Sequence, residues 1–329
     1  MVLRDAPKPQ ITSKEILVRV KSVGICGNDL TIYKGHFSAE RSKPPLIIGH
    51  EFSGVVEEAS DDAKRFKEGT RVAIDPLISC GVCHCCRSGI AHVCKNLKLL
   101  GIDVDGAYAE YVKVSEERVH PISDSLSFDE GALVEPVAVA VHCVGRASLA
   151  IGETVLVIGG GPIGMLIALT SLQAGAKQVV LTEIQQYRSS LARKLGLNCL
   201  NPNDGSFAEA INQFFEGKGP DIAFEVTGTE NGFQQAVDLV SVRGRVIEVG
   251  VPKGKMSLDL RKGNFGELSI IGSRVYTPAD IDMAIELLTR GTMKAKELIQ
   301  KFDLEKAEDA IKQLISGKSN IMKSILIVN

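Results

Sequence analysis

A cluster of cysteines is the strongest chemical signal in this sequence. Five of the eight cysteines fall between positions 80 and 94, and four of them, in the spacing C-x2-C-x2-C-x7-C, are Cys80, Cys83, Cys86 and Cys94. Four thiolates on one short loop satisfy tetrahedral zinc and leave no open position, which is typical of a structural site. A chance group of buried thiols is disfavoured, because free cysteines rarely cluster so tightly. Cys85 lies in the same loop and is interpreted as a bystander, although it leaves a second choice of ligand open.

A second set of metal-ligating residue types is dispersed along the chain. Cys26 lies in GICGND, His50 and Glu51 lie in GHE, and Glu135 lies in VEP. One thiolate, one imidazole and a carboxylate form a zinc set with room for a fourth, exchangeable ligand, as a catalytic site requires. Each residue alone has a plainer explanation, namely a buried apolar cysteine, a core histidine or a surface carboxylate. Their occurrence in one chain with the four-cysteine loop favours the metal interpretation.

A glycine-rich turn of the form G-x-G-x-x-G follows the apolar run Thr154–Ile158. Its residues are Gly159, Gly160, Gly161, Pro162, Ile163 and Gly164. The turn ends a predicted strand and opens a predicted helix, which is the context that binds a dinucleotide. The first glycine permits the tight turn, the second lets the backbone approach a pyrophosphate, and the third lets helix and strand pack closely. The free N–H groups of the helix N-terminus favour the phosphates.

An acidic residue, Glu183, stands 19 residues after Gly164, at the end of the next predicted strand. Its carboxylate would accept hydrogen bonds from the adenosine ribose and would repel a 2′-phosphate, so we predict NAD rather than NADP. A solvated carboxylate at a strand end is the plainer alternative. Arg188 is a conflicting signal, because its guanidinium could reach a 2′-phosphate or only flank the adenine.

The elements that must position these residues change in character near Gly152. Before it, short β-rich runs alternate with turns, which predicts an irregular, mostly β region to about residue 140. After it, apolar runs of strand length alternate with helical stretches, which predicts a doubly wound parallel sheet. The β-rich runs are Glu15–Val20, Gly54–Glu57 and Arg71–Ile74; the later strand-length runs are Thr154–Ile158, Val179–Leu181, Ile222–Val226, Val246–Val249, Leu268–Ile271 and a terminal SILIV; the helical stretches are Pro162–Ala174, Arg188–Leu195, Gly232–Leu239, Asp280–Thr289 and Leu304–Ile315.

Composition excludes several classes of function. The 329 residues carry a formal net charge of −2, so no overall field would hold a nucleic acid. Hydrophobic residues make up 44% and charged residues 24%, as in ordinary globular enzymes. No apolar run approaches the length of a membrane span, and no signal peptide is evident. We therefore expect a soluble, cytoplasmic protein.

Taken together, these motifs resemble the zinc-containing medium-chain alcohol and polyol dehydrogenases. GICGNDL, GHEFSGVV, the four-cysteine loop, the VEP segment and VLVIGGGPIGML occur in that order, and the likeness spans roughly residues 11–329. The resemblance implies an α/β fold with a GroES-like, mostly β catalytic domain over residues 1–140 and 276–329. It implies a Rossmann dinucleotide-binding domain, with a doubly wound parallel sheet, over residues 141–275.

The resemblance also implies roles for individual residues. Cys26 and His50 would be catalytic zinc ligands, while Glu51 or Glu135 would bind the metal directly or through water, and which one does so stays open. Asp29 would orient the ligand histidine through its other ring nitrogen. The residues expected to contact the nicotinamide end of the cofactor are Val249, Gly250, Ser273 and Arg274.

Three departures from the family pattern affect these expectations. Asn28 stands where relatives usually have serine or threonine, and Thr31 stands where many place a relay histidine. We therefore expect the proton to leave through water, Glu51 or Glu135 and the cofactor ribose. The chain also begins near the second strand of the family pattern, so an edge of the catalytic domain is expected to be missing or rebuilt.

The implied activity is zinc-dependent hydride transfer from a secondary hydroxyl of a polyol, sugar or sugar acid to NAD, giving a ketone. The VEP segment and GSRVYTPAD resemble the sorbitol and sugar-acid branch. A dehydrogenase of simple secondary alcohols or threonine is the alternative within the family, and a nucleotide-sensing protein that retains the fold is the alternative outside enzymes. Zinc-free quinone or enoyl reductases are disfavoured because they typically lack both metal sets. The apolar run Leu268–Ser273 is expected at a sheet edge, where pairing would give a homodimer or homotetramer.

Overall fold

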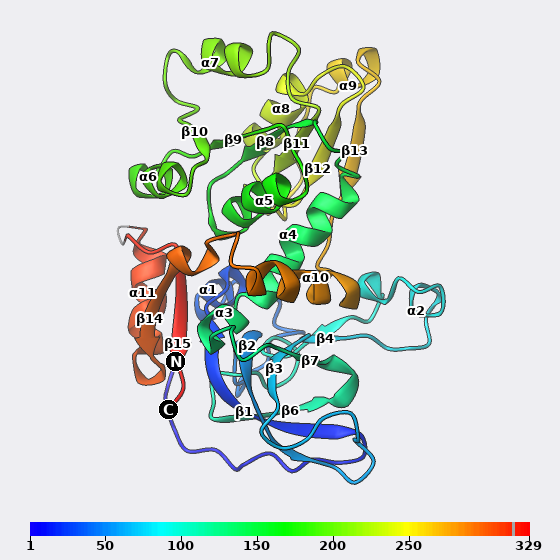
Figure 1. Cartoon of the computed structure of the whole chain (residues 1–329), viewed down its shortest axis with the longest axis vertical. Helices are drawn as coiled ribbons and strands as arrows, with labels where there is room; N and C mark the ends of the chain where they lie inside the picture. The colour runs from blue at the N-terminus through cyan, green and yellow to red at the C-terminus, as the bar shows by residue number, and fades with distance from the viewer. Residues whose placement is uncertain (318–319) are drawn as a thin grey trace. The chain divides into compact units, whose positions relative to one another are not determined.

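The computed structural model describes residues 1–317 and 320–329 and divides the chain into two compact units. The first unit comprises Met1–Pro136 and Thr277–Asn329, and the second comprises Val137–Tyr276. Both ends of the chain therefore belong to the first unit, and the second unit is one continuous insertion (Figure 1). No helix in the described part of the chain is both long and apolar enough to span a bilayer.

The first unit is built on a largely antiparallel sheet with the strand order β14-β15-β1-β2-β3-β7, in which β6 also pairs with β1. The strands are β1 (Glu15–Gly24), β2 (Glu51–Ala59), β3 (Arg71–Ile74), β6 (Tyr111–Ser115), β7 (Val119–Pro121), β14 (Ile299–Asp303) and β15 (Lys323–Ile327). The last strand of the chain, β15, runs antiparallel to the first, β1, and parallel to β14. At one end of β1, Gly24 lies opposite Glu51 of β2 and Ile325 of β15.

Shorter elements surround this sheet. They are the helices α1 (Gly27–Tyr33), α2 (His84–Arg87), α3 (Phe128–Gly131), α10 (Pro278–Thr289) and α11 (Ala307–Ser316), and the two-stranded ribbon of β4 (Leu77–Ile78) and β5 (Lys98–Leu99). The hydroxyl of Tyr33 on α1 donates a 2.8 Å hydrogen bond to Glu308 on α11. This bond links the N-terminal and C-terminal segments that form the first unit. α4 (Val134–Arg146) begins in the first unit and continues into the second.

The second unit is an all-parallel sheet, six-stranded among the described residues, with the order β10-β9-β8-β11-β12-β13. Its strands are β8 (Thr154–Ile158), β9 (Gln178–Thr182), β10 (Asn198–Leu200), β11 (Ile222–Glu225), β12 (Arg245–Glu248) and β13 (Ser269–Gly272), and its helices are α5 (Pro162–Gln173), α6 (Gln186–Lys194), α7 (Phe207–Phe214), α8 (Glu230–Leu239) and α9 (Arg261–Phe265). A row of buried side chains crosses the sheet centre through Val180, Leu156, Ala223 and Val246. The predicted parallel sheet is confirmed, and so is the position of β13 at its edge.

The elements that the sequence pattern missed include the strands β10 and β14 and the helix α4. β10 has three residues, and β14 has a charged sequence, IQKFD, whose side chains are largely exposed. α4 is a regular 13-residue helix that begins before residue 140, so the first region is less uniformly β than expected. Residues 1–14 contain no strand.

Candidate metal centres and dinucleotide site

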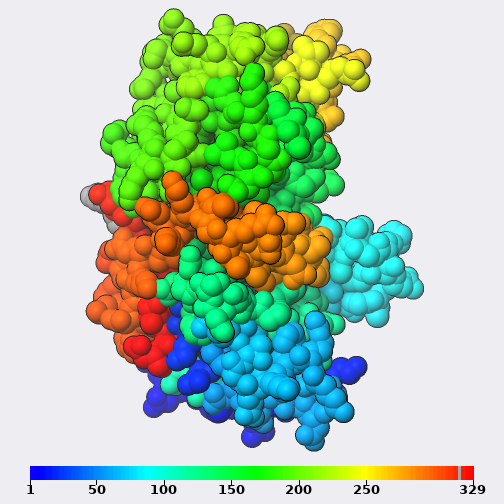
Figure 2. Space-filling view, viewed as in Figure 1, coloured from blue at the N-terminus to red at the C-terminus, as the bar shows by residue number. Residues whose placement is uncertain are grey.

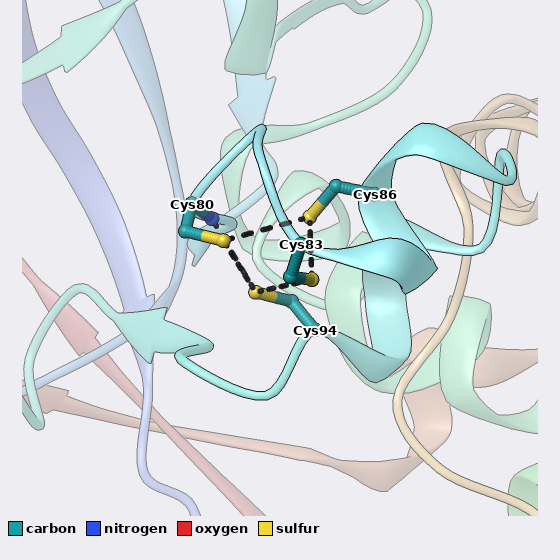
Figure 3. Close-up of side chains that lie close together, drawn as sticks. All are labelled: Cys80, Cys83, Cys86 and Cys94. Atoms are coloured by element: carbon teal, nitrogen blue, oxygen red, sulfur yellow. Dashed lines mark hydrogen bonds between the residues drawn. The ribbon is translucent and has the colours of Figure 1, made fainter.

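The four cysteines of the loop converge on one point in the first unit. Cys80 follows β4, Cys83 directly precedes the one-turn helix α2, and Cys86 lies within α2. Their Sγ atoms and that of Cys94 lie 3.5–4.0 Å apart in four pairs (Figure 3). In the space-filling view, the cyan part of the chain that includes α2 stands out from the rest of the first unit (Figure 2). A metal ion bound by the four cysteines would stabilise this segment, which has little packing of its own.

The geometry of this cluster fits zinc. Zn–S bonds of about 2.3 Å in a tetrahedron place the sulfur atoms about 3.8 Å apart, which is within the observed range. Backbone N–H groups stabilise the thiolate form: those of Cys80 and Asn96 donate to Cys94 Sγ at 3.4 and 3.3 Å. The backbone N–H of Cys86 lowers the pKa of the Cys83 thiol to about 6. Cys85 is not among the cysteines whose sulfur atoms come together, and four thiolates leave no position for a substrate.

A second cluster in the first unit contains Cys26, His50 and Glu51. One ligand atom from each lies within 4.8 Å of the other two. Cys26 occupies the junction between β1 and α1, whereas His50 and Glu51 lie where the chain enters β2. His50 and Glu51 are each 2% exposed. Antiparallel pairing of β1 with β2 brings these sequence-distant residues together, and three ligands leave one tetrahedral position open.

The turns that carry these residues depend on specific neighbours. Asp29, at the third position of α1, accepts a 2.8 Å hydrogen bond from the backbone N–H of Cys26 and so stabilises the helix start. Gly49 has φ +98°, and a side chain there would overlap the ring of Tyr108. The Tyr108 hydroxyl in turn donates to Asp29 at 3.2 Å. Sequence reasoning did not single out Tyr108.

Buried acidic groups dominate the electrostatics of this cluster. Burial raises the pKa of the Cys26 thiol and of the Asp29 carboxyl. Burial by itself would lower the pKa of His50, but the charges of Cys26, Asp29 and Glu135 raise it well above its usual range. A divalent cation would offset this negative charge, since a bound metal is usually the largest local charge in its site. The donor set of sulfur, nitrogen and oxygen is one that zinc accepts.

Asp29 and His50 face each other without a hydrogen bond. Asp29 Oδ1 lies 3.9 Å from His50 Nδ1, and neither atom has a hydrogen-bond partner among the described residues. Both atoms are buried, so a small closing movement would satisfy two polar groups at once. The contact between Asp29 and His50 that the resemblance implies is therefore present as two facing groups, at a separation too long for a hydrogen bond.

Glu135, Asn28 and Thr31, which were also considered for this site, are not among the three residues whose ligand atoms converge. Glu135, on the first turn of α4, is 8% exposed and is not one of the three converging residues, although its charge acts on His50. Asn28 is exposed, and the Thr31 hydroxyl donates to the carbonyl of Gly27 at 3.0 Å.

A buried lysine that sequence reasoning missed completes this cluster. Lys323 begins β15 and is 5% exposed, and its ammonium group donates to the carbonyl of Ile25 at 3.0 Å and to Glu51 Oε2. Burial alone would lower the pKa of Lys323, but the charges of Glu51 and Cys26 raise it. The signal in the sequence is a lysine at the start of KSILI, a terminal run whose last three residues are apolar.

In the second unit, the glycine-rich turn joins β8 to α5. Gly159 has φ +105°, and a side chain there would approach Thr227 Cγ2 to 2.8 Å. A side chain at Gly164 would overlap the carbonyl oxygen of Gly159. A Cβ at Gly161 would meet only Arg188 Nη1, at 3.8 Å, so the turn leaves space there. Tight turn, open space and close packing are the three properties that a pyrophosphate cradle requires.

Glu183 stands beside this turn at the end of β9. Its Oε1 accepts a 2.8 Å hydrogen bond from the backbone N–H of Gln185, and its Oε2 lies 3.7 Å from Arg188 Nη1. A Cβ on Gly160 would lie 3.0 Å from Glu183 Oε2. The carboxylate therefore borders the turn, and Arg188 is drawn toward it.

The residues expected at the nicotinamide end follow the neighbouring strands. The N–H groups of Val249 and Gly250 both donate to the carbonyl of Glu225 at 2.9 Å. Ser273 donates to Cys143 Sγ at 3.3 Å, and Arg274 is exposed. These residues and the glycine-rich turn follow the carboxyl ends of parallel strands, where open α/β sheets bind ligands.

Comparisons with known proteins agree with this geometry. Two family models match the chain: Alcohol dehydrogenase GroES-like domain over residues 12–124, and Zinc-binding dehydrogenase over residues 162–290. The chain is 38% identical over 285 residues to 2-dehydro-3-deoxy-L-galactonate 5-dehydrogenase of Pseudoalteromonas atlantica, which covers 87% of this chain and 83% of that protein. It is 31% identical over 335 residues to sorbitol dehydrogenase of Bacillus subtilis, covering 99% and 94%. A zinc-binding dehydrogenase of Sinorhizobium meliloti 1021, solved bound to NADP, superposes with a TM-score of 0.92 at 32% identity, covering 99% and 95%.

Proposed function

This chain belongs to the zinc-containing medium-chain dehydrogenase family, and on that premise we propose that it oxidises a secondary hydroxyl of a sugar acid, sugar or polyol to a ketone. The proposed hydride acceptor is NAD. The observation that carries the proposal is the convergence of Cys26, His50 and Glu51, which leaves one ligand position open. A nucleotide-sensing protein has no need of an open metal position.

The first unit would hold the metal and the substrate hydroxyl. Cys26, His50 and Glu51 are the residues that would bind zinc, which when bound would act as a Lewis acid that makes an alcohol easier to deprotonate. Asp29 would keep the imidazole of His50 oriented. With Glu51 on the metal, Glu135 would accept the proton, since the amide of Asn28 cannot relay a proton as a hydroxyl does.

The second unit would hold the dinucleotide. The open space at Gly161 and the N-terminus of α5 suit the pyrophosphate, while Val249 and Gly250 follow the neighbouring strand. Fixing the nicotinamide and the substrate in one geometry would convert an encounter of two molecules into a single oriented step. Hydride would pass from the carbinol carbon to the nicotinamide ring.

A substrate panel tests this function. Zinc-replete protein is mixed with NAD or NADP and with sugar acids, hexitols, short secondary diols and L-threonine, and the reduced cofactor is followed by absorbance. We expect activity with a sugar acid or polyol that exceeds activity with threonine, because the sugar-acid dehydrogenase of Pseudoalteromonas atlantica is 38% identical to this chain, whereas L-threonine 3-dehydrogenases are 32–34% identical to it. Highest activity with threonine would contradict the substrate class, and no activity with any alcohol would contradict the function.

The preference for NAD depends on Glu183. We expect NAD to give the higher kcat/KM, and we expect Glu183→Gln to reduce the NAD/NADP ratio by about tenfold, since a hydrogen bond to a charged group contributes roughly 1.5–3 kcal/mol. Glu153→Gln, which changes a carboxylate at the opposite end of β8, is the matched control. A higher kcat/KM with NADP in the unmodified protein would remove the role proposed for Glu183.

A further inference from the structure

Tyr108 belongs to a short segment that is attached to the chain just before His50. The backbone N–H groups of residues 106–108 donate to the carbonyl groups of residues 47–49 at 2.7–2.9 Å. Neither segment is part of a strand, since residues 47–49 precede β2 and residues 106–108 precede β6. These hydrogen bonds therefore do not belong to the main sheet, and they fix the backbone that leads into His50.

Glycines allow the two segments to approach so closely. A Cβ at Gly101 would lie 2.5 Å from the carbonyl oxygen of Gly49, and a Cβ at Gly106 would overlap the same oxygen. A Cβ at Gly49 would in turn overlap the ring of Tyr108. The aromatic ring is thus held against the residue that directly precedes His50.

The hydroxyl of Tyr108 reaches Asp29, on the other side of the cluster. It donates to Asp29 Oδ2 at 3.2 Å, and the backbone N–H of Cys26 donates to the same oxygen at 2.8 Å. The other oxygen, Oδ1, has no hydrogen-bond partner among the described residues and lies 3.9 Å from His50 Nδ1. Two donors on one oxygen therefore leave the other oxygen to face His50.

A second donor matters because an aspartate side chain rotates easily. The torsion that turns its carboxyl group has broad minima, so one hydrogen bond restricts it little. The two donors to Asp29 come from separate segments, one from the start of α1 and one from residue 108. Asp29 is also fully buried, where each hydrogen bond that its carboxylate lacks is costly.

We propose that Tyr108 is a positioning residue that fixes both members of the Asp29–His50 pair, the histidine through the backbone of residues 47–49 and the aspartate through the phenolic hydroxyl. The inference rests on the proposed function, because it assumes that the Cys26 cluster holds zinc. An acceptor behind a ligand histidine sets the orientation of the ring and the strength of its bond to the metal. The hydroxyl of Tyr108 therefore raises the zinc affinity of a cluster to which it contributes no ligand.

The test measures zinc affinity at the Cys26 cluster. Zinc-loaded protein is titrated with a chelator of known zinc affinity, and the zinc that is missing in Cys26→Ser is assigned to this cluster. Tyr108→Phe removes the hydroxyl and keeps the ring against Gly49. We expect it to lower this zinc affinity by about fivefold, the factor that corresponds to the net contribution of one hydrogen bond. Zinc held by the four-cysteine loop should be unaffected.

A double-mutant cycle shows whether Tyr108 acts through Asp29. Asp29→Asn removes the charge that faces His50, so in this background Tyr108→Phe should change the zinc affinity by less than about twofold. A tyrosine that only packed in the fold would weaken zinc binding equally in both backgrounds. Tyr33→Phe is the matched control, because it removes another hydrogen bond from a tyrosine to a carboxylate in the first unit, and it should leave the zinc affinity unchanged.

The outcomes separate this inference from the proposed function. A loss of zinc affinity in Tyr108→Phe that disappears in the Asp29→Asn background supports the positioning role. Equal or higher affinity in Tyr108→Phe overturns that role, as does the same loss in both backgrounds, and either result leaves the proposed function standing. If the unmodified protein holds no zinc that depends on Cys26, the proposed function fails, and this inference fails with it.

Discussion

The two metal clusters of the first unit use zinc-binding side chains in opposite ways. Cys80, Cys83, Cys86 and Cys94 come from one short loop, and nearby backbone N–H groups stabilise their thiolates. The Cys26 cluster gathers a thiolate, an imidazole and a carboxylate from two separate stretches of chain, with further charged side chains around them. The first cluster is closed and local, whereas the second is open and depends on the sheet.

This difference indicates which interactions stabilise each cluster. When a metal is bound, four thiolates from one loop define the tetrahedral geometry by themselves, and metal binding contributes to the free energy of folding. The open cluster must be held by its surroundings, because three ligands from separate stretches of chain do not by themselves specify a geometry. Asp29, Tyr108 and Lys323 supply that support through hydrogen bonds to Cys26, Asp29 and Glu51.

The largest expected contrast concerns turnover. Cys26→Ser should lower kcat/KM by about 10³-fold or more, since metal-assisted charge stabilisation contributes several kcal/mol and each 1.36 kcal/mol is a factor of ten. Steady-state kinetics checks the loss, and fluorescence titration with NADH should show that cofactor binding persists. Near-normal activity in Cys26→Ser would contradict the assignment of turnover to the Cys26 cluster.

The second largest effect is expected on the free energy of unfolding, when the four-cysteine cluster is disrupted. Cys83→Ser opens the closed cluster and should lower the free energy of unfolding by about 4 kcal/mol, in the range that loss of a metal site reaches. Activity per folded molecule should stay close to that of the unmodified protein. Chemical denaturation, with kinetics on the folded fraction, measures both quantities. An unchanged unfolding midpoint would mean that this loop is not held by metal.

A smaller effect is expected from the support of the open cluster. Asp29→Asn can still accept the N–H of Cys26, but it removes the charge that faces His50. We expect zinc affinity at this cluster to fall by about tenfold, as measured by competition with a chelator of known affinity. Asp62→Asn, a change at an exposed carboxylate on the same unit, serves as the control. Equal zinc affinity in both variants would show that Asp29 acts only on the helix start.

The smallest effect tests the choice of ligands in the loop. Cys85 lies within α2, beside the four converging cysteines but not among them. Cys85→Ser should change the free energy of unfolding by less than about 0.5 kcal/mol, as surface substitutions usually do, and elemental analysis should still find two zinc ions per chain. A fall to one zinc would show that Cys85 replaces one of the predicted ligands.

Much of the fold was accessible from local pattern. Apolar runs of strand length located β8, β9, β11 and β12 to within about a residue, because a strand buried on both faces must be apolar throughout. The run that located β13 is also apolar, although this edge strand is exposed or half-buried along its length. β14 escaped detection because its partly exposed sequence, IQKFD, carries no such signal. Its pairing with β15 comes from the fold as a whole.

Local spacing was likewise enough to indicate the four-cysteine loop and the glycine-rich turn, since all the groups that act together in each are close along the chain. The residues around the open cluster are different. The contact of Lys323 with Glu51, the room for it at Gly24 and the 3.9 Å separation of Asp29 and His50 exist only once β1 lies between β2 and β15. Chemistry carried by neighbours in sequence can be inferred from the sequence, whereas the charge environment of a buried site is decided by which distant strands pair, and strand pairing is a property of the whole sheet.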